Sequence, residues 1–260
     1  MTARAALVVL ILAAIAPTGR SAQAAQAVDV ALVLAADVSR SIDDEEFALQ
    51  RRGYSAAISD PRVLEAIQSG RHGAIAITFV EWAGETEQKT VVDWTVIADA
   101  AAASKFASAI AEAPRSFLGR TAIGTAIDFS RGLIGESGFT ADRSIIDVSG
   151  DGTNNQGRQV TEARNEAVGA QITINGLAIF NRRAAAEGGF LALHTNPPGG
   201  LAKYYRENVI GGSGAFVVQI DDFKTFDEAM IRKLISEISA KPPGVETGAL
   251  PPKKSSGLAD

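Results

Sequence analysis

The chain has 260 residues, of which 46% are hydrophobic and 21% are charged, and its formal net charge is −5 at pH 7. Because it has no cysteine and two histidines, disulfide scaffolds, cysteine nucleophiles, iron–sulfur clusters and histidine-rich zinc sites are excluded as its basis. The negative net charge disfavours nucleic acid as a main partner, and we expect no nucleic-acid binding.

Residues 1–27 have the order of a secretory signal peptide. Arg4 supplies a positive charge, and residues 5–16 form an apolar stretch too short to span a bilayer. Two small-x-small patterns follow, which predict cleavage before Ala25 or Val28. A retained membrane anchor is the alternative. We expect a periplasmic or secreted protein with no membrane span in its mature chain.

Beyond this segment, strand and helix patterns alternate, which predicts an α/β fold whose mostly parallel sheet has helices on both faces. The first strand is a nearly continuous apolar run, as a central strand requires. The first helix is expected to begin at Ser41, with Asp44 completing a capping box. In chain order we predict strand 28–36, helix 41–59, strand 74–82, an antiparallel strand 89–96, helices 99–113 and 121–133, strand 144–149, helix 159–170, strands 172–179 and 215–220, and helix 222–238.

The end of the chain has a different composition. Residues 241–260 are rich in proline and small residues and cannot bury enough apolar surface to offset their ordering entropy. We predict a disordered tail there, which leaves residues 28–240 as one domain.

The direction of the chain predicts where a functional site lies. We take the carboxyl end of the first strand as the top of the sheet and follow the direction of each later helix and strand. Three separate segments then lie at the top: residues 37–41, 119–121 and 150–152. Ligands of open α/β sheets bind outside the carboxyl ends of the strands, where the strand order reverses. We therefore expect these segments to meet.

The side chains of these segments indicate a cation site. Asp37, Ser39, Ser41, Thr121 and Asp151 offer carboxylate and hydroxyl oxygens, which favour Mg²⁺, Mn²⁺ or Ca²⁺ over zinc or copper. No imidazole or thiolate is among them, and His72 and His194 are predicted to lie on the surface. In the competing structural interpretation, Ser41 caps a helix, Asp37 accepts loop amide hydrogen bonds and Asp151 occupies an Asp-Gly turn.

These residues resemble a known family. Asp37-Val-Ser39-Arg-Ser41, Thr121 and Asp151 match, position by position, the metal-ion-dependent adhesion site of von Willebrand factor A-type (VWA) domains. The resemblance covers roughly residues 28–240. Segments 147–155 and 174–179 further resemble a bacterial exported subgroup of unassigned function.

The resemblance implies a Rossmann-like three-layer fold, whose six strands include one short antiparallel edge strand. It also implies a divalent cation whose open position takes a carboxylate from a partner, and a last helix that can shift with ligand state. The chain departs from the family pattern twice: Arg40 stands where many relatives carry glycine, and Gly150 stands where many carry threonine.

We therefore predict an exported, metal-dependent protein-binding module for adhesion or assembly, with no catalytic residue and a partner that presents an acidic side chain. Arg40, Asn154, Asn155 and the loop 180–200 are the candidate partner contacts. Asp147, inside a strand, is expected to have a structural role, since a buried carboxylate needs a partner.

Two other functions compete with this prediction. A magnesium-dependent phosphohydrolase would use Asp37 as its nucleophile, but Ser39 stands where such enzymes of the haloacid-dehalogenase type carry a second aspartate. A solute-binding protein would need a cleft that a single domain with a polar metal site does not usually have.

Overall fold

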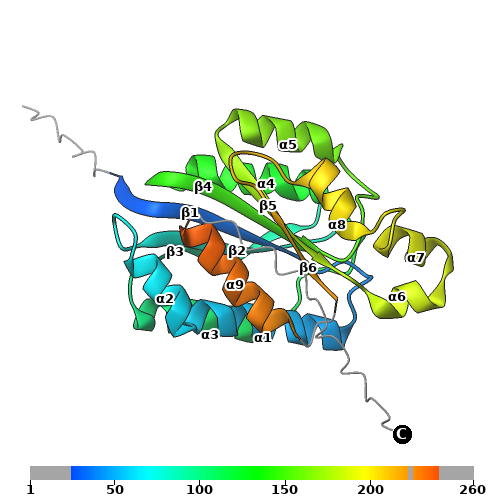
Figure 1. The fold of residues 1–260 in the computed structure, drawn as a ribbon, viewed down its shortest axis with the longest axis horizontal. Helices are drawn as coiled ribbons and strands as arrows, with labels where there is room; N and C mark the ends of the chain where they lie inside the picture. The colour runs from blue at the N-terminus through cyan, green and yellow to red at the C-terminus, as the bar shows by residue number, and fades with distance from the viewer. Residues whose placement is uncertain (1–24, 222–224, 240–260) are drawn as a thin grey trace, which may run out of the picture.

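The computed structural model describes residues 25–221 and 225–239, and their core is a six-stranded sheet in the order β3-β2-β1-β4-β5-β6 (Figure 1). The β2–β3 pair is antiparallel and the other neighbouring strands are parallel, as the sequence predicts. The strands are β1 (Gln26–Asp37), β2 (Ile75–Trp82), β3 (Gln88–Ile97), β4 (Phe139–Gly150), β5 (Ile172–Ile179) and β6 (Val217–Ile220).

Helices cover both faces of this sheet, which gives the predicted three layers. One face, the lower one in Figure 1, carries α1 (Asp44–Ser59), α2 (Pro61–Gln68), α3 (Ala100–Glu112) and α9 (Phe226–Ser239). The other face carries α4 (Ile123–Glu136), α5 (Val160–Gly169), α8 (Leu201–Tyr204) and a π-helical turn, η1 (Tyr205–Val209). The short helices α6 (Arg182–Glu187) and α7 (Gly189–Thr195) lie beyond the end of the sheet.

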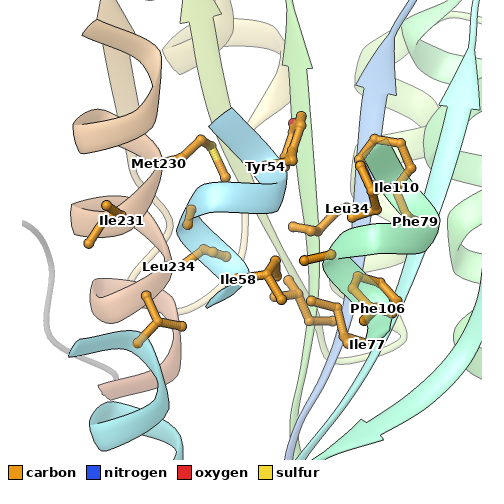
Figure 2. Packing of buried hydrophobic residues seen from close by; sticks show 14 of the residues in the cluster. Leu34, Tyr54, Ile58, Ile77, Phe79, Phe106, Ile110, Met230, Ile231 and Leu234 are labelled. Carbon is orange, nitrogen blue, oxygen red and sulfur yellow. The ribbon is translucent and has the colours of Figure 1, made fainter. Parts of the chain in front are cut away.

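The two-residue period of β1 explains why its apolar run is continuous. Leu32 and Leu34 point to the layer of α1, α3 and α9, whereas Val33 and Ala35 point to α4 and α5, and all four are fully buried. Figure 2 shows the first of these layers, with α1 between α9 and α3 and Tyr54 of α1 directed at the strands. Each of the leucine and valine side chains contributes about 1.5–3 kcal/mol of burial free energy.

The structure corrects the start of one predicted helix and adds a helix that was not predicted. Helix α1 begins at Asp44, and its capping box joins Asp43 to Glu46: the Glu46 N–H donates to Asp43 Oδ1 (2.8 Å) and the Asp43 N–H donates to Glu46 Oε2 (3.0 Å). Ser41 is not the cap, because its hydroxyl donates to Asp151 instead. Helix α2 was not predicted, although Pro61 stands at its first turn and Asp60 caps it.

Other boundaries also differ from the predictions. Strand β4 begins at Phe139, five positions before the predicted start, because its first residues pair with the start of β1. The segment 180–214, predicted only as a long connection, contains α6, α7, α8 and η1. The predictions for residues 1–24 and for the tail after residue 240 lie outside the described residues. No helix in the described ranges is long and apolar enough to cross a membrane.

Asp147 has the partner that its burial requires. Its Oδ1 lies 2.6 Å from the Nζ of Lys233 on α9, and Lys233 also pairs with Glu237 one turn further along that helix. Asn175 of β5 donates to Glu237 Oε1 over 2.9 Å. The charged side chains of Asp147, Lys233 and Glu237 are fully buried, so this cluster joins α9 to the centre of the sheet. The structural role predicted for Asp147 is confirmed.

Candidate metal centre

The predicted site lies at the carboxyl ends of β1 and β4, two neighbouring strands at the centre of the sheet. Asp37 is the last residue of β1, and Asp151 directly follows β4. The chain leaves these two strands toward opposite sides of the sheet, so the strand order reverses between them. Thr121 arrives from the segment that precedes α4. The three segments meet here because β1 and β4 are parallel neighbours in the sheet.

The five predicted residues form one hydrogen-bonded group. Ser41 Oγ donates to Asp151 Oδ1 (2.6 Å), and Ser39 Oγ lies 3.1 Å from Ser41 Oγ. Thr121 Oγ1 lies 3.4 Å from Ser39 Oγ, and the Ser39 N–H donates to Asp37 Oδ1 over 2.7 Å. All five residues are buried. The structure thus places two carboxylates and three hydroxyls around one small volume.

The two carboxylates lie in an electrostatic environment that suits a cation. Burial raises the pKa of Asp37 well above its ordinary value, and the neighbouring charge of Asp151 raises it further. Burial also raises the pKa of Asp151, whereas hydrogen bonds from Ser41 and from Asn181 Nδ2 (2.8 Å) lower it. Asp37 Oδ2 is buried without a hydrogen-bond partner among the described residues. A divalent cation would neutralise both charges, so the side chains fit such an ion.

An arginine that the sequence analysis did not single out holds the loop of the two serines. Arg115, in the segment between α3 and α4, donates from Nη2 to the carbonyl oxygens of Val38, Ser39 and Ile42, each over 2.8 Å. The segment that carries Arg115 is itself fixed, because the Ser116 N–H donates to the buried Glu81 Oε2 over 2.8 Å. No local pattern marks this contact, since it joins residues more than seventy positions apart.

A steric reason explains why position 150 carries glycine where many VWA domains carry threonine. A Cβ atom at this position would lie 2.7 Å from the Tyr205 hydroxyl and 2.9 Å from Asp37 Oδ2. Tyr205, from η1, is fully buried and occupies the space that a threonine side chain would need. The glycine of β4 and the tyrosine of the inserted segment therefore fit one another.

His194 lies at the site, which corrects one prediction. The residue is 6% exposed, and its Nε2 lies 3.1 Å from Thr121 Oγ1. It packs so closely over Gly152 that a Cβ there would lie 2.3 Å from Nε2. The prediction that His194 lies on the surface was therefore wrong, whereas His72 is exposed, as predicted. Burial lowers the pKa of His194, which favours the neutral form of its imidazole.

The candidate partner contacts divide into two groups. Arg40 is exposed at the rim of the site. Asn155 and Asn154 are half-buried and brace the start of α4: Asn155 Oδ1 accepts from the Thr121 N–H (3.0 Å), and Asn154 Oδ1 accepts from the Gly124 N–H (3.3 Å). A role of any of these three in partner binding stays a prediction.

Comparison with known proteins identifies the chain at the level of its family. The model of the family described as "Protein of unknown function (DUF1194)" matches residues 27–242. The chain belongs to this family. A search among curated proteins finds no match.

Solved structures show which fold the DUF1194 chain has. It resembles proximal thread matrix protein 1 from the mussel byssus, solved with a zinc-occupied MIDAS motif (16% identity, TM-score 0.55, 82% of this chain and 49% of that chain). It also resembles a von Willebrand factor type A protein from Catenulispora acidiphila (14%, 0.53, 82% and 43%) and BatB from Bacteroides thetaiotaomicron (18%, 0.50, 82% and 100%). The chain thus spans about half the length of the first two proteins. The DUF1194 chain has the VWA fold, as predicted.

The mouth of the site in the DUF1194 chain combines apolar and basic side chains. A cavity of about 260 Å³ opens over Ser39, Ser41 and Thr121, and its wall includes Phe190 and the exposed Arg120. Three large hydrophobic side chains on the flanking segments are more than half exposed: Leu118, Phe190 and Leu193.

A second group of possible metal ligands in the DUF1194 chain lies at the amino ends of β1 and β4, away from this site. One ligand atom from each of Asp29, His72 and Asp142 lies within 4.8 Å of the others. The Asp29 carboxylate already accepts from the His72 N–H (2.9 Å) and the Ala74 N–H (3.2 Å), so it has a structural role in joining β1 to the start of β2.

Proposed function

We propose that this DUF1194 protein is an exported binding module whose Asp37, Ser39, Ser41, Thr121 and Asp151 hold a divalent cation. The observation that carries the proposal is the pairing of two fully buried carboxylates, Asp37 and Asp151, around a set of three hydroxyl oxygens. Hard oxygen donors of this kind favour Mg²⁺, Mn²⁺ or Ca²⁺. The cation would supply a Lewis-acidic point at the mouth of the cavity that binds an oxygen of another molecule.

The partner we propose is a protein that presents an acidic side chain. Two carboxylates balance the charge of the cation but leave it coordinatively unsaturated, so a third carboxylate can replace a water molecule. The rim favours an acidic side chain with an apolar neighbour, because the exposed Phe190 lines the same cavity as Arg40 and Arg120. Since the chain is itself acidic, we expect the local cation rather than long-range attraction to drive association.

The competing phosphohydrolase function is less well supported. A nucleophilic Asp37 would have to reach a phosphorus atom, yet the residue has no exposed surface and its Oδ1 accepts the Ser39 N–H. Ser39 takes the place in which a second aspartate would act as acid and base. We propose no catalytic residue in this chain.

Calorimetric titration of the chelator-stripped protein with Mg²⁺ or Mn²⁺ is expected to show binding at this site. Asp37→Asn and Asp151→Asn keep the size of the side chain but remove a negative charge, and each is expected to weaken binding by more than about 100-fold, beyond what the loss of an outer-sphere contact costs. Asp142→Asn, at the opposite end of the sheet, is the matched control and should bind like the parent. Equal affinity in all four proteins would contradict the proposed site.

The same variants test the binding function. Partners captured from an envelope extract in Mg²⁺ should elute with chelator, and the Asp37→Asn protein should not capture them. Thr121→Ala should weaken capture, because it removes one of the three hydroxyls proposed to hold the cation. Partners that remain bound in chelator would show that the protein uses another surface.

Export makes a separate prediction about the N-terminus. Gln26 and Ala27 belong to β1 and pair with Phe139 and Thr140 of β4, so cleavage before Ala25 keeps the whole strand, whereas cleavage before Val28 removes its first two residues. We therefore expect mass spectrometry of the envelope fraction to find a chain that begins at Ala25. An intact chain in the cytoplasm, or one that begins at Val28, would refute this.

A further inference from the structure

We propose that His194 Nε2 is an additional ligand of the cation, which makes this a mixed nitrogen and oxygen site that prefers Zn²⁺ to Mg²⁺. The inference rests on the proposed cation site and concerns its metal preference. It starts from a residue that the VWA motif does not include: His194 comes from α7, far along the chain from the five oxygen-bearing residues.

The spacing of the donor atoms is the first argument. Ser41 Oγ, Ser39 Oγ, Thr121 Oγ1 and His194 Nε2 follow one another at 3.1, 3.4 and 3.1 Å. Neighbouring ligands of an octahedral ion with bonds of about 2.1 Å lie about 3 Å apart. The imidazole nitrogen therefore stands in the same relation to the Thr121 hydroxyl as the two serine hydroxyls do to each other.

The orientation of the ring is the second argument. His194 Nδ1 lies 3.1 Å from Thr153 Oγ1, and the Thr153 N–H donates to the His194 carbonyl over 3.0 Å. When Nδ1–H donates to Thr153, Nε2 carries the lone pair and faces Thr121 Oγ1 at 3.1 Å and Asn155 Nδ2 at 3.4 Å. Histidines that bind metals commonly donate their other ring N–H in this way, which sets the tautomer and the angle of the ring. Because Gly152 has no side chain, the His194 ring can pack directly against its backbone.

The chemistry of the added ligand decides the metal preference. Five oxygen ligands alone favour Mg²⁺ or Ca²⁺, whereas a neutral imidazole is a good ligand for zinc and for other first-row transition metals. Mg²⁺ gains little from imidazole nitrogen and keeps water in its place. The same pocket should therefore bind Zn²⁺ more tightly than Mg²⁺, and this difference in affinity should depend on His194.

Two measurements test this inference. In calorimetric titrations, His194→Gln is expected to weaken Zn²⁺ binding by at least about tenfold, as for the loss of a metal-site partner, and to change Mg²⁺ binding by less than about threefold. His72→Gln is the matched control, because it removes the other histidine and with it the Asp29–His72–Asp142 group. Pulsed electron paramagnetic resonance of the Mn²⁺-loaded parent should show coupling to an imidazole nitrogen, which persists in His72→Gln and disappears in His194→Gln.

The outcomes separate this inference from the proposed function. If the parent binds Mn²⁺ without nitrogen coupling, or if His194→Gln leaves the ratio of Zn²⁺ to Mg²⁺ affinity unchanged, His194 is only a hydrogen-bond partner of Thr121 and the inference is wrong. The cation site itself then stands, provided that Asp37→Asn still weakens binding by more than about 100-fold. If the parent binds none of the three ions, both proposals fail. The spectrum of the parent needs no variant, so a folding defect in His194→Gln would not prevent the test.

Discussion

Lys233→Met is expected to lower the free energy of unfolding by about 3–5 kcal/mol, because it removes the cation of a buried charge cluster. The Nζ of Lys233 lies 2.6 Å from Asp147 Oδ1 and also pairs with Glu237, and none of the three side chains is exposed to solvent. Without the lysine, two carboxylates would remain together in the core between β4 and α9. Urea unfolding, followed by circular dichroism, measures the loss.

Two further variants make this prediction specific. Arg232→Met is the matched control on the same helix, since Arg232 is exposed and its ion pair with Glu228 should contribute no more than about 1 kcal/mol. The double variant Lys233→Met/Glu237→Gln should recover part of the stability at pH 7, because one of the two uncompensated charges is gone. Similar losses for Lys233→Met and Arg232→Met would contradict the role of the buried cluster.

Arg115→Met is expected to lower both the stability of the fold and the affinity for the cation. The guanidinium donates to the carbonyl oxygens of Val38, Ser39 and Ile42, so its removal leaves three acceptors without their charged donor. Losing such hydrogen bonds should cost about 2 kcal/mol or more in unfolding free energy. Because the same loop positions Ser39 and Ser41, the affinity for Mn²⁺ should fall by about 10–100-fold, as for the loss of other residues that orient metal ligands.

A conservative variant distinguishes the geometry of Arg115 from its charge. Arg115→Lys keeps a positive charge near Asp37 but cannot reproduce the reach of the guanidinium, so it should recover part of the stability and less of the affinity. Titration with Mn²⁺ below the unfolding temperature of each variant measures the affinity on folded protein. Unchanged affinity in a folded Arg115→Met protein would show that the loop keeps its shape without the arginine.

Much of the fold follows from local patterns. The continuous apolar run of β1 places that strand at the centre of a sheet, since both of its faces must be buried. Once strands and helices alternate, chain direction alone brings Asp37, Thr121 and Asp151 to one end of the sheet. The oxygen-bearing part of the candidate site could therefore be predicted without any knowledge of the tertiary contacts.

The start of α1 shows where local patterns stop being sufficient. Both Ser41 and Asp43 can cap a helix, and each has an acidic residue three positions later. The choice falls on Asp43 because the Ser41 hydroxyl donates to Asp151, which is 110 residues further along the chain. A hydroxyl that serves a distant carboxylate is not available to a nearby backbone amide.

The sequence by itself determined the order of the strands along the chain, the covered parallel sheet and the position of five oxygen-bearing residues at its end, because periodicity is local and the direction of the chain follows from it. Only the tertiary structure decided that Arg115 holds the serine loop, that Tyr205 fills the space above Gly150 and that His194 enters the site. These three side chains come from irregular segments between elements, or from short helices within the long insertion after β5. Their positions depend on contacts with residues 41–77 positions away, or on close packing against glycines of β4 and the loop after it, which no periodic pattern encodes.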